Sequence, residues 1–219
     1  MKTKTKALAL FLSAVLLVVT TVFTTMAYLT SKTDVVKNTF TYGKVAITLD
    51  EAPVDLYGNI VTGNRRAENK YKLIPGHEYV KDPTVHVAAD SEESYIRMIV
   101  TITDLEDVKA VLGKDTTTGY FLPQNFVKGW DNSVWVTTGV VDEKNNTATY
   151  EFRYYKTVST VGKTAVTDLE ALFTDIVMPD GVKNADIVKL AEMEIDIVAH
   201  AIQADGFESA DEAWAAWNN

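Results

Sequence analysis

The sequence predicts an all-β fold, an antiparallel β-sandwich or jelly roll with short helical insertions and a C-terminal helix. Several short segments alternate apolar and polar residues with the period of two that half-buried strands show. Turn-forming residues separate these segments, and no long amphipathic helix follows a strand, as a parallel α/β fold would require. Hydrophobic residues make up 47% of the chain, which is enough for a core and too much for a disordered protein.

Alternation predicts the strands in chain order. Strands are expected over residues 39–50, 79–80, 84–87, 94–103, 133–141, 147–155 and 193–203. Residues 51–72 hold many turn formers and charges, and we expect a polar loop there. Pro83 stands just before one short strand and suggests an edge strand or a bulge, because proline has no N–H for a ladder.

The strongest hairpin signal surrounds the sequence DEKNN. Asn145 and Asn146 tolerate the positive φ that a tight hairpin turn needs. In the following strand Tyr150, Phe152 and Tyr154 alternate with polar residues, which predicts that the three aromatic rings face the core. They could instead form a sugar-binding aromatic face together with Tyr155.

Helices are expected only as short insertions and at the C-terminal end. Residues 104–112 have a helical pattern, and residues 169–178 are ambiguous between helix and strand. Residues 181–190 are expected to form a loop or one helical turn. Ser209 with Glu212 three residues later makes a capping box for a final helix that carries Trp214 and Trp217 on one face.

The N-terminal segment has the pattern of an export signal. Lysines at three of the first six positions precede an uncharged apolar stretch of 20 residues, Ala7 to Met26. Thr25 and Ala27 are the small residues that a signal peptidase needs before a cut at Tyr28. We expect residues 1–27 to be a signal peptide and residues 28–219 to be one exported domain. The stretch could instead remain as an uncleaved anchor, since it can span roughly 30 Å of hydrocarbon.

Charge and composition exclude several functions. The chain has 21 basic and 30 acidic residues and a formal net charge of −9, so it lacks the basic excess that neutralises nucleic-acid phosphates. We therefore expect no nucleic-acid partner, and contact with a membrane only through an uncleaved signal segment. The absence of cysteine excludes disulfides, thiol catalysis and thiolate zinc sites.

No catalytic motif can be identified, so we assign no catalytic residue, no cofactor and no metal ligand. The chain has three histidines, His77, His86 and His200. A zinc helix beginning at His77 would need a second histidine where Lys81 stands. His86 and His200 fall in predicted strands and could share a metal only if those strands were neighbours. A zinc peptidase using these histidines and acidic partners is the enzyme alternative, and the acidic runs 90–93 and 104–107 could bind calcium or be solvated surface.

Several segments in this order resemble the TasA/camelysin family of Gram-positive bacteria. The resemblance is carried by Ala27–Thr30 after a threonine-rich apolar stretch, Asn38–Val45, Ile74–Gly76, Lys81–Val85, Ser94–Arg97 and Ala199–Phe207. These segments span most of residues 27–217. The resemblance implies a jelly-roll β-sandwich, secretion after processing by a signal peptidase of the SipW type, and a place at the cell surface or in the extracellular matrix.

For the TasA branch, the resemblance implies assembly into biofilm fibres by donor-strand addition. The donor would be Tyr28–Asn38, with Tyr28, Leu29, Val35 and Val36 as its assembly residues. An exposed sheet edge offers the unpaired N–H and C=O groups that such a strand needs. We therefore expect a secreted, non-enzymatic structural protein whose partners are further copies or other matrix proteins. The camelysin branch, classed as a surface metalloprotease, implies the zinc-peptidase alternative.

Overall fold

The computed structural model describes residues 12–15, 43–113 and 126–217. Contacts divide the chain after Tyr42, and residues 43–219 make up the unit that holds the strands. Residues 12–15 are helical. None of the helices in the described ranges is both long and apolar enough to cross a membrane. The assigned cleavage residues Thr25, Ala27 and Tyr28 and the donor residues Leu29, Val35 and Val36 lie outside the described residues.

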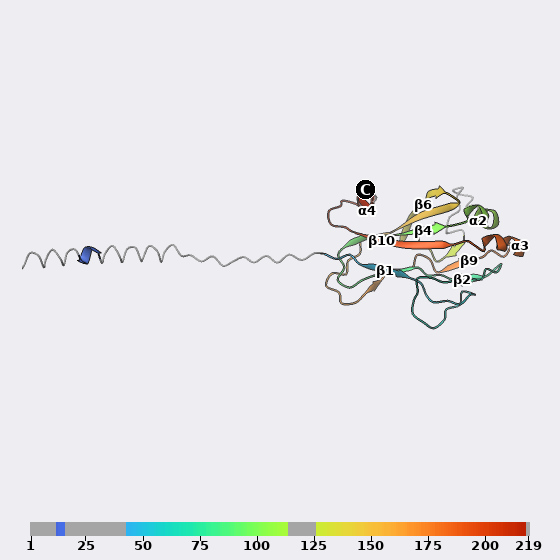
Figure 1. Ribbon diagram of the computed structural model, residues 1–219, viewed down its shortest axis with the longest axis horizontal. Coiled ribbons are helices and arrows are strands. Elements are labelled where there is room, and N and C mark those ends of the chain that lie inside the picture. The colour runs from blue at the N-terminus through green and yellow to red at the C-terminus, as the bar shows by residue number, and fades with distance from the viewer. Residues whose placement is uncertain (1–11, 16–42, 114–125, 218–219) are drawn as a thin grey trace, which may run out of the picture. The chain divides into compact units, whose positions relative to one another are not determined.

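The unit is built from antiparallel strands with short helices between them (Figure 1). The strands are β1 (Ile47–Asp50), β2 (Glu78–Val80), β3 (Thr84–Val87), β4 (Ser94–Ile102), β5 (Val127–Lys128), β6 (Trp135–Lys144), β7 (Thr147–Tyr154), β8 (Thr167–Asp168), β9 (Asp175–Val177) and β10 (Ile195–Gln203). The helices are α2 (Leu105–Leu112), α3 (Asn184–Ile187), the 3₁₀ turn η2 (Val188–Leu190) and α4 (Ala210–Trp217). The prediction of an all-β antiparallel fold with a C-terminal helix is confirmed.

The strands form three sheets around one hydrophobic core. The orders are β10-β4-β7-β6, β1-β3-β8 and β2-β9-β5, and every pairing is antiparallel. All three sheets contribute buried side chains to this core. Examples are Met98 on β4, Phe152 on β7, Val85 on β3, Tyr79 on β2 and Ile176 on β9.

The predicted hairpin is confirmed, with a tighter turn than the DEKNN segment suggested. β6 continues to Lys144, which pairs with Thr147, so the loop holds only Asn145 and Asn146 with φ of 51° and 60°. Positive φ at both positions is the type I′ geometry that matches strand twist. The side-chain oxygen of Asn146 also accepts the Glu106 N–H at 2.8 Å. The hairpin turn therefore caps the N-terminus of α2 from about 40 residues away in sequence.

β1 is shorter than the strand predicted over residues 39–50. Residues 39–42 lie outside the described ranges, and the backbone just before β1 bonds to a turn. The Glu92 N–H donates to the Lys44 carbonyl at 2.8 Å, and the Ala46 N–H donates to Ser91 Oγ at 3.2 Å. These bonds hold the segment away from regular pairing, which begins at Ile47.

The prediction for Pro83 needs correction, and the open choice for residues 169–178 is resolved. Pro83 marks neither an edge nor a bulge, because β3 is the central strand of its sheet and Pro83 precedes its first residue. Proline is tolerated there because its missing N–H lies outside the ladder. The ambiguous residues 169–178 contain the short strand β9 and no helix, since their N–H groups bond to neighbouring carbonyls. Leu172, for example, donates to the Pro83 carbonyl at 3.0 Å.

The predicted polar loop 51–72 is only partly exposed. Its first four residues are buried, and Glu51 forms an ion pair with Lys81, each less than 10% exposed. The Asn69 side chain bonds to Glu51 Oε2 at 3.2 Å and to the Ala52 carbonyl at 2.9 Å. Burying a carboxylate is costly unless it is paired and hydrogen-bonded, and both conditions are met here.

Candidate functional site

β10 is one edge of the four-stranded sheet, and its register with β4 is unbroken over all nine residues. At one end the Thr103 N–H donates to the Glu194 carbonyl at 3.1 Å, and at the other the Ala204 N–H donates to the Glu93 carbonyl at 2.8 Å. Such bonded pairs recur at every second residue of an antiparallel ladder. The even-numbered residues of β10 therefore bond to β4, and the odd-numbered residues direct their N–H and C=O groups outward.

The odd-numbered residues of β10, whose N–H and C=O groups point away from β4, also carry apolar side chains. Ile195, Ile197, Ala199 and Ala201 pack against the core but are only partly buried. They pair with Ile102, Val100, Met98 and Ile96 of β4, which are almost completely buried. The edge thus combines backbone groups that lack a strand partner among the described residues with apolar side chains that the core covers incompletely.

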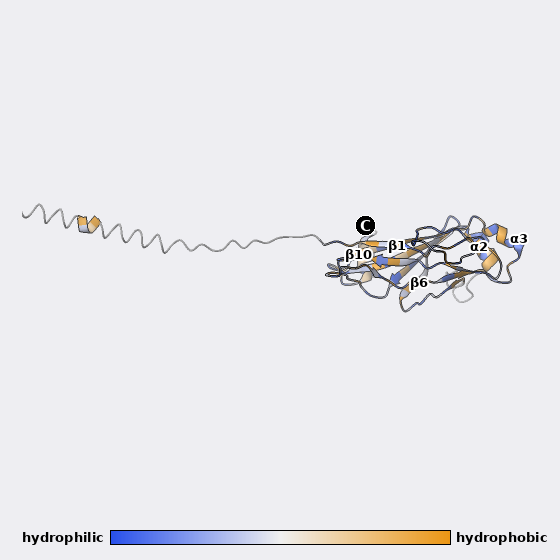
Figure 2. Cartoon of the chain, turned by 90° about the horizontal axis from the view of Figure 1, so that it is seen from below, coloured by the Kyte–Doolittle hydropathy of each residue, from blue (hydrophilic) through white to orange (hydrophobic). Residues whose placement is uncertain are grey.

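β1 borders this edge of β10 without pairing with it. Cα atoms of the two strands approach within 8 Å, the strands belong to different sheets, and they lie side by side in both views (Figure 1) (Figure 2). The Ala88 N–H donates to the Ala46 carbonyl at 2.9 Å, which leaves Ile47 and Leu49 facing outward from β3. Glu51 is already paired on that side with Arg66. We call residues 47–49 and the outward side of β10 the open seam.

The opposite edge of the same sheet differs from β10. β6 has register shifts between Thr137 and Val140 and between Val140 and Asp142. It ends in the charged run Asp142–Lys144, which is exposed. Bulges and charges are the devices by which proteins keep an edge strand from pairing with another chain. Of the two edges, β10 is therefore the one suited to accept a strand.

His86 on β3 is held between two carboxylates. Its Nδ1 lies 2.7 Å from Asp168 Oδ1 on β8, and its Nε2 lies 2.8 Å from Asp50 Oδ1 on β1. Only the imidazolium can donate from both nitrogens. Burial lowers the pKa of His86, but the two carboxylates outweigh it and raise the pKa above its ordinary value. Arg65 completes the network through Asp50 at 2.5 Å and Asp82 at 2.8 Å.

The other two histidines have different surroundings. His77 Nε2 lies 2.7 Å from the Tyr57 carbonyl. His200, on β10, accepts the Arg97 Nε–H at Nδ1 over 3.3 Å. β3 and β10 belong to different sheets, so the strands of His86 and His200 are not paired neighbours. Within the described ranges, no group of three or more histidine and acidic residues has an arrangement that could hold a metal ion.

The aromatic row of β7 is core. Tyr150, Phe152 and Tyr154 are at most 9% exposed, which confirms the prediction from alternation. A sugar-binding face built on this row is therefore contradicted, because buried rings cannot stack on a ligand. Only Tyr155, at 49% exposure, presents its ring to solvent.

A buried arginine fixes α4 to the outer face of the sheet. Arg97 is 5% exposed, lies 3.1 Å from Glu151 Oε2 and places its guanidinium 4.2 Å from the ring centroid of Trp214. His200 stacks on Trp217 with centroids 4.9 Å apart. Alternation predicted that Arg97 faces away from the core, but it could not predict that Arg97 is buried under α4. The two tryptophans on one face of the predicted helix were the available signal that the helix covers a sheet.

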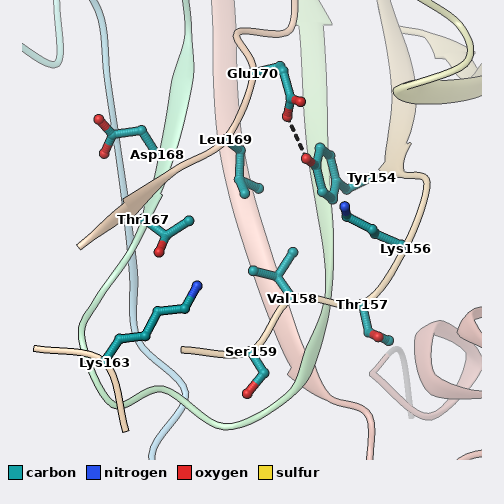
Figure 3. Close-up of a pocket in the computed structure, with 10 residues that line it drawn as sticks. All are labelled: Tyr154, Lys156, Thr157, Val158, Ser159, Lys163, Thr167, Asp168, Leu169 and Glu170. Carbon is teal, nitrogen blue, oxygen red and sulfur yellow. Dashed lines mark hydrogen bonds between the residues drawn. The ribbon is translucent and has the colours of Figure 1, made fainter. Parts of the chain in front are cut away.

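A pocket of about 550 Å³ opens beside β8 and the segment that follows β7 (Figure 3). Val158 and Leu169 line it and are largely buried. Glu170 accepts the Tyr154 hydroxyl at 2.5 Å, and this hydrogen bond lowers the pKa of Glu170. This pocket could not be predicted from the sequence, because its lining combines the ends of two strands with loop residues that carry no motif.

The chain matches no protein-family model, no curated protein and no solved structure. The resemblance to the TasA/camelysin family therefore stays a prediction that depends on its sequence segments. Any functional conclusion must be argued from the geometry of the described residues, and the open seam is the most distinctive feature among them.

Proposed function

We propose that residues 28–219 form a secreted, non-enzymatic structural protein of the cell surface or biofilm matrix, with a jelly-roll sandwich that assembles into fibres. In each contact the N-terminal segment of one copy adds as a strand to the open seam of the next. The observation that carries the proposal is the outward side of β10, where apolar side chains and backbone groups without a strand partner among the described residues coincide.

The length and pattern of the donor segment suit this edge. Tyr28–Asn38 has 11 residues, which extend to roughly 36 Å at about 3.3 Å per residue, whereas the nine residues of β10 need roughly 30 Å. Two of its three charged residues, Lys32 and Asp34, share one face of an extended strand. The opposite face carries Leu29 and Val35, which can cover the apolar row of the seam, and its one charge, Lys37, lies near the end of the segment.

Strand addition of this kind explains why export would control assembly. The donor and the acceptor are different surfaces, so each contact leaves a free donor and a free acceptor and the chain of contacts does not close. Before cleavage at Ala27, the donor segment is joined directly to the apolar signal stretch. Cleavage would release its end and allow it to reach a neighbouring copy.

Comparison of two N-terminal forms tests the proposal. Protein that begins at Tyr28 should polymerise on incubation, whereas protein that begins at Gly43 keeps the seam but lacks the donor and should stay monomeric. Electron microscopy and sedimentation distinguish the two results. If both forms polymerise, or if neither does, donor-strand assembly is wrong for this chain.

Two proline substitutions in β10 test the acceptor side. The Ala199 N–H points outward, so Ala199→Pro loses no bond to β4 but removes an outward donor and blocks the edge. This variant should fold, fail to polymerise, and terminate wild-type fibres, because it can donate a strand but cannot accept one. Val198→Pro is the matched control, since it removes a bond to Ile99 and should weaken the fold itself. Normal fibres from Ala199→Pro protein would show that β10 is not the acceptor.

A further inference from the structure

The charges around the pocket beside β8 are unequally engaged. Of its two carboxylates, Asp168 turns away from the centre in Figure 3 and contacts His86, while Glu170 accepts the Tyr154 hydroxyl. Lys156 and Lys163 extend their ammonium ends toward the centre from opposite sides (Figure 3). Neither lysine is within ion-pair distance of a carboxylate in the described part of the chain. An incoming ligand therefore meets the two ammonium groups together with the hydrogen-bonded carboxylate of Glu170.

Each lysine has one contact that positions it, a backbone bond for Lys163 and a ring contact for Lys156. Lys163 closes a turn in which its N–H donates to the Thr160 carbonyl at 2.9 Å. Thr160 is fully buried, and its hydroxyl donates to the Ala88 carbonyl at 2.6 Å and accepts the Ser91 N–H at 2.8 Å. Lys156 lies with its Nζ 4.7 Å from the ring centroid of the exposed Tyr155, which raises the pKa of Lys156. The backbone of Lys163 and the ammonium group of Lys156 are thus both positioned beside the pocket.

The rest of the lining indicates which anion this pocket suits. Val158 and Leu169 give an apolar floor, and the hydroxyls of Ser159 and Thr167 lie among the lining residues. Sugar rings have apolar faces and many hydroxyls, so they match a surface of this mixture better than a bare inorganic ion does. A volume of about 550 Å³ is in the range of small-ligand pockets.

We propose that the pocket between Lys156 and Lys163 binds an acidic saccharide, with the sugar carboxylate between the two ammonium groups and the ring against Val158 and Leu169. This site is independent of the open seam, so the protein could hold a matrix polysaccharide whether or not it forms fibres. The contact differs from the sugar-binding face excluded above, because it depends on the ammonium groups of Lys156 and Lys163 and not on stacking against the rings of β7.

Digalacturonate is the probe, with neutral digalactose and inorganic phosphate as comparison ligands, and binding to the purified chain is followed by calorimetry and by NMR shifts. Digalacturonate should bind, more weakly as salt rises, and digalactose should bind at least about tenfold more weakly, since one charge-assisted contact changes affinity by roughly that factor. Lys163→Gln and Lys156→Gln should each lower digalacturonate affinity about tenfold. Lys144→Gln is the control, because Lys144 is also exposed but lies at the end of β6.

Each variant should unfold at the same temperature as the wild-type protein, which verifies that its fold is intact. Equal affinity for digalactose and digalacturonate would overturn the proposal, because the charge would then play no part. Phosphate that competes as strongly as digalacturonate would also overturn it, since the site would be a simple anion site. Absence of digalacturonate binding, or equal loss in the Lys144→Gln control, would do the same.

Discussion

Removal of the His86 imidazole should destabilise the protein at low pH and not at high pH. In the folded protein both ring nitrogens face carboxylates, and these raise the pKa of His86 above its ordinary value near 6.5. A group whose pKa is higher in the folded state stabilises the fold below the unfolded pKa. That stabilisation is lost as the pH rises through the folded pKa. His86→Gln should therefore cost most at pH 5.5 and little at pH 8.5.

The size of the effect follows from the exposure of the two partners. Asp168 is 68% exposed, and an ion pair in such a place contributes about 0.5 kcal/mol. Asp50 is 26% exposed, and a charge-assisted hydrogen bond there contributes about 1.5 kcal/mol. The free energy of unfolding should fall by about 2 kcal/mol at pH 5.5. For a chain of this length, that corresponds to a fall of about 4–8 °C in the unfolding temperature.

Thermal unfolding followed by circular dichroism at the two pH values provides the assay. His77→Gln is the control, because His77 bonds to the Tyr57 carbonyl and forms no ion pair among the described residues. An NMR titration of the His86 ring protons in the wild-type protein measures the pKa directly. The reasoning fails if His86→Gln lowers the unfolding temperature equally at both pH values. It also fails if His86 titrates at or below the pKa of an unperturbed histidine.

Two further substitutions test contacts that join distant parts of the chain. Asn146→Gly keeps the positive φ but removes the cap of α2, and it should lower the free energy of unfolding by about 1 kcal/mol in urea titrations, whereas Asn145→Gly should change it little. Arg97→Met leaves the half-buried Glu151 with one partner fewer and removes the contact with Trp214, so we expect a loss of about 3 kcal/mol. The more exposed Arg153→Met should cost less than about 1 kcal/mol, and equal losses would contradict the assigned burial of Arg97.

Features that depend on local pattern could be predicted from the sequence. The period of two placed β4, β7 and β10, and the Asn145-Asn146 pair placed the turn because both residues tolerate positive φ. Features that depend on partners far along the chain could not be predicted. Leu172 has the spacing of a helical residue, yet its N–H bonds to the Pro83 carbonyl, and no local signal reports that carbonyl.

The same limit applies to the charged residues and to the edges. The sequence places Arg65 in a polar loop. Its partners Asp50 and Asp82 lie on or beside strands of one sheet, and the sequence does not show that these strands come together. Alternation along 193–203 predicts a strand, but it cannot state whether that strand is central or at an edge. The order β10-β4-β7-β6 is therefore the information that the structure adds to the functional argument.

The surroundings of β10 favour a single donor strand over pairing between two whole sheets. Pairing of β10 with the β10 of a second copy would be symmetric, would close as a dimer, and would bring the two copies of β1 together, because each β1 lies within 8 Å of its own β10. A lone extended segment brings no such neighbour. Protein that begins at Gly43 should therefore remain monomeric at high concentration, yet bind one synthetic peptide of residues 28–38. Sedimentation equilibrium with labelled peptide measures both properties. A dimer formed without peptide, or a peptide with Leu29 and Val35 changed to lysine that binds equally well, would show that the seam is not selecting a single apolar-faced strand.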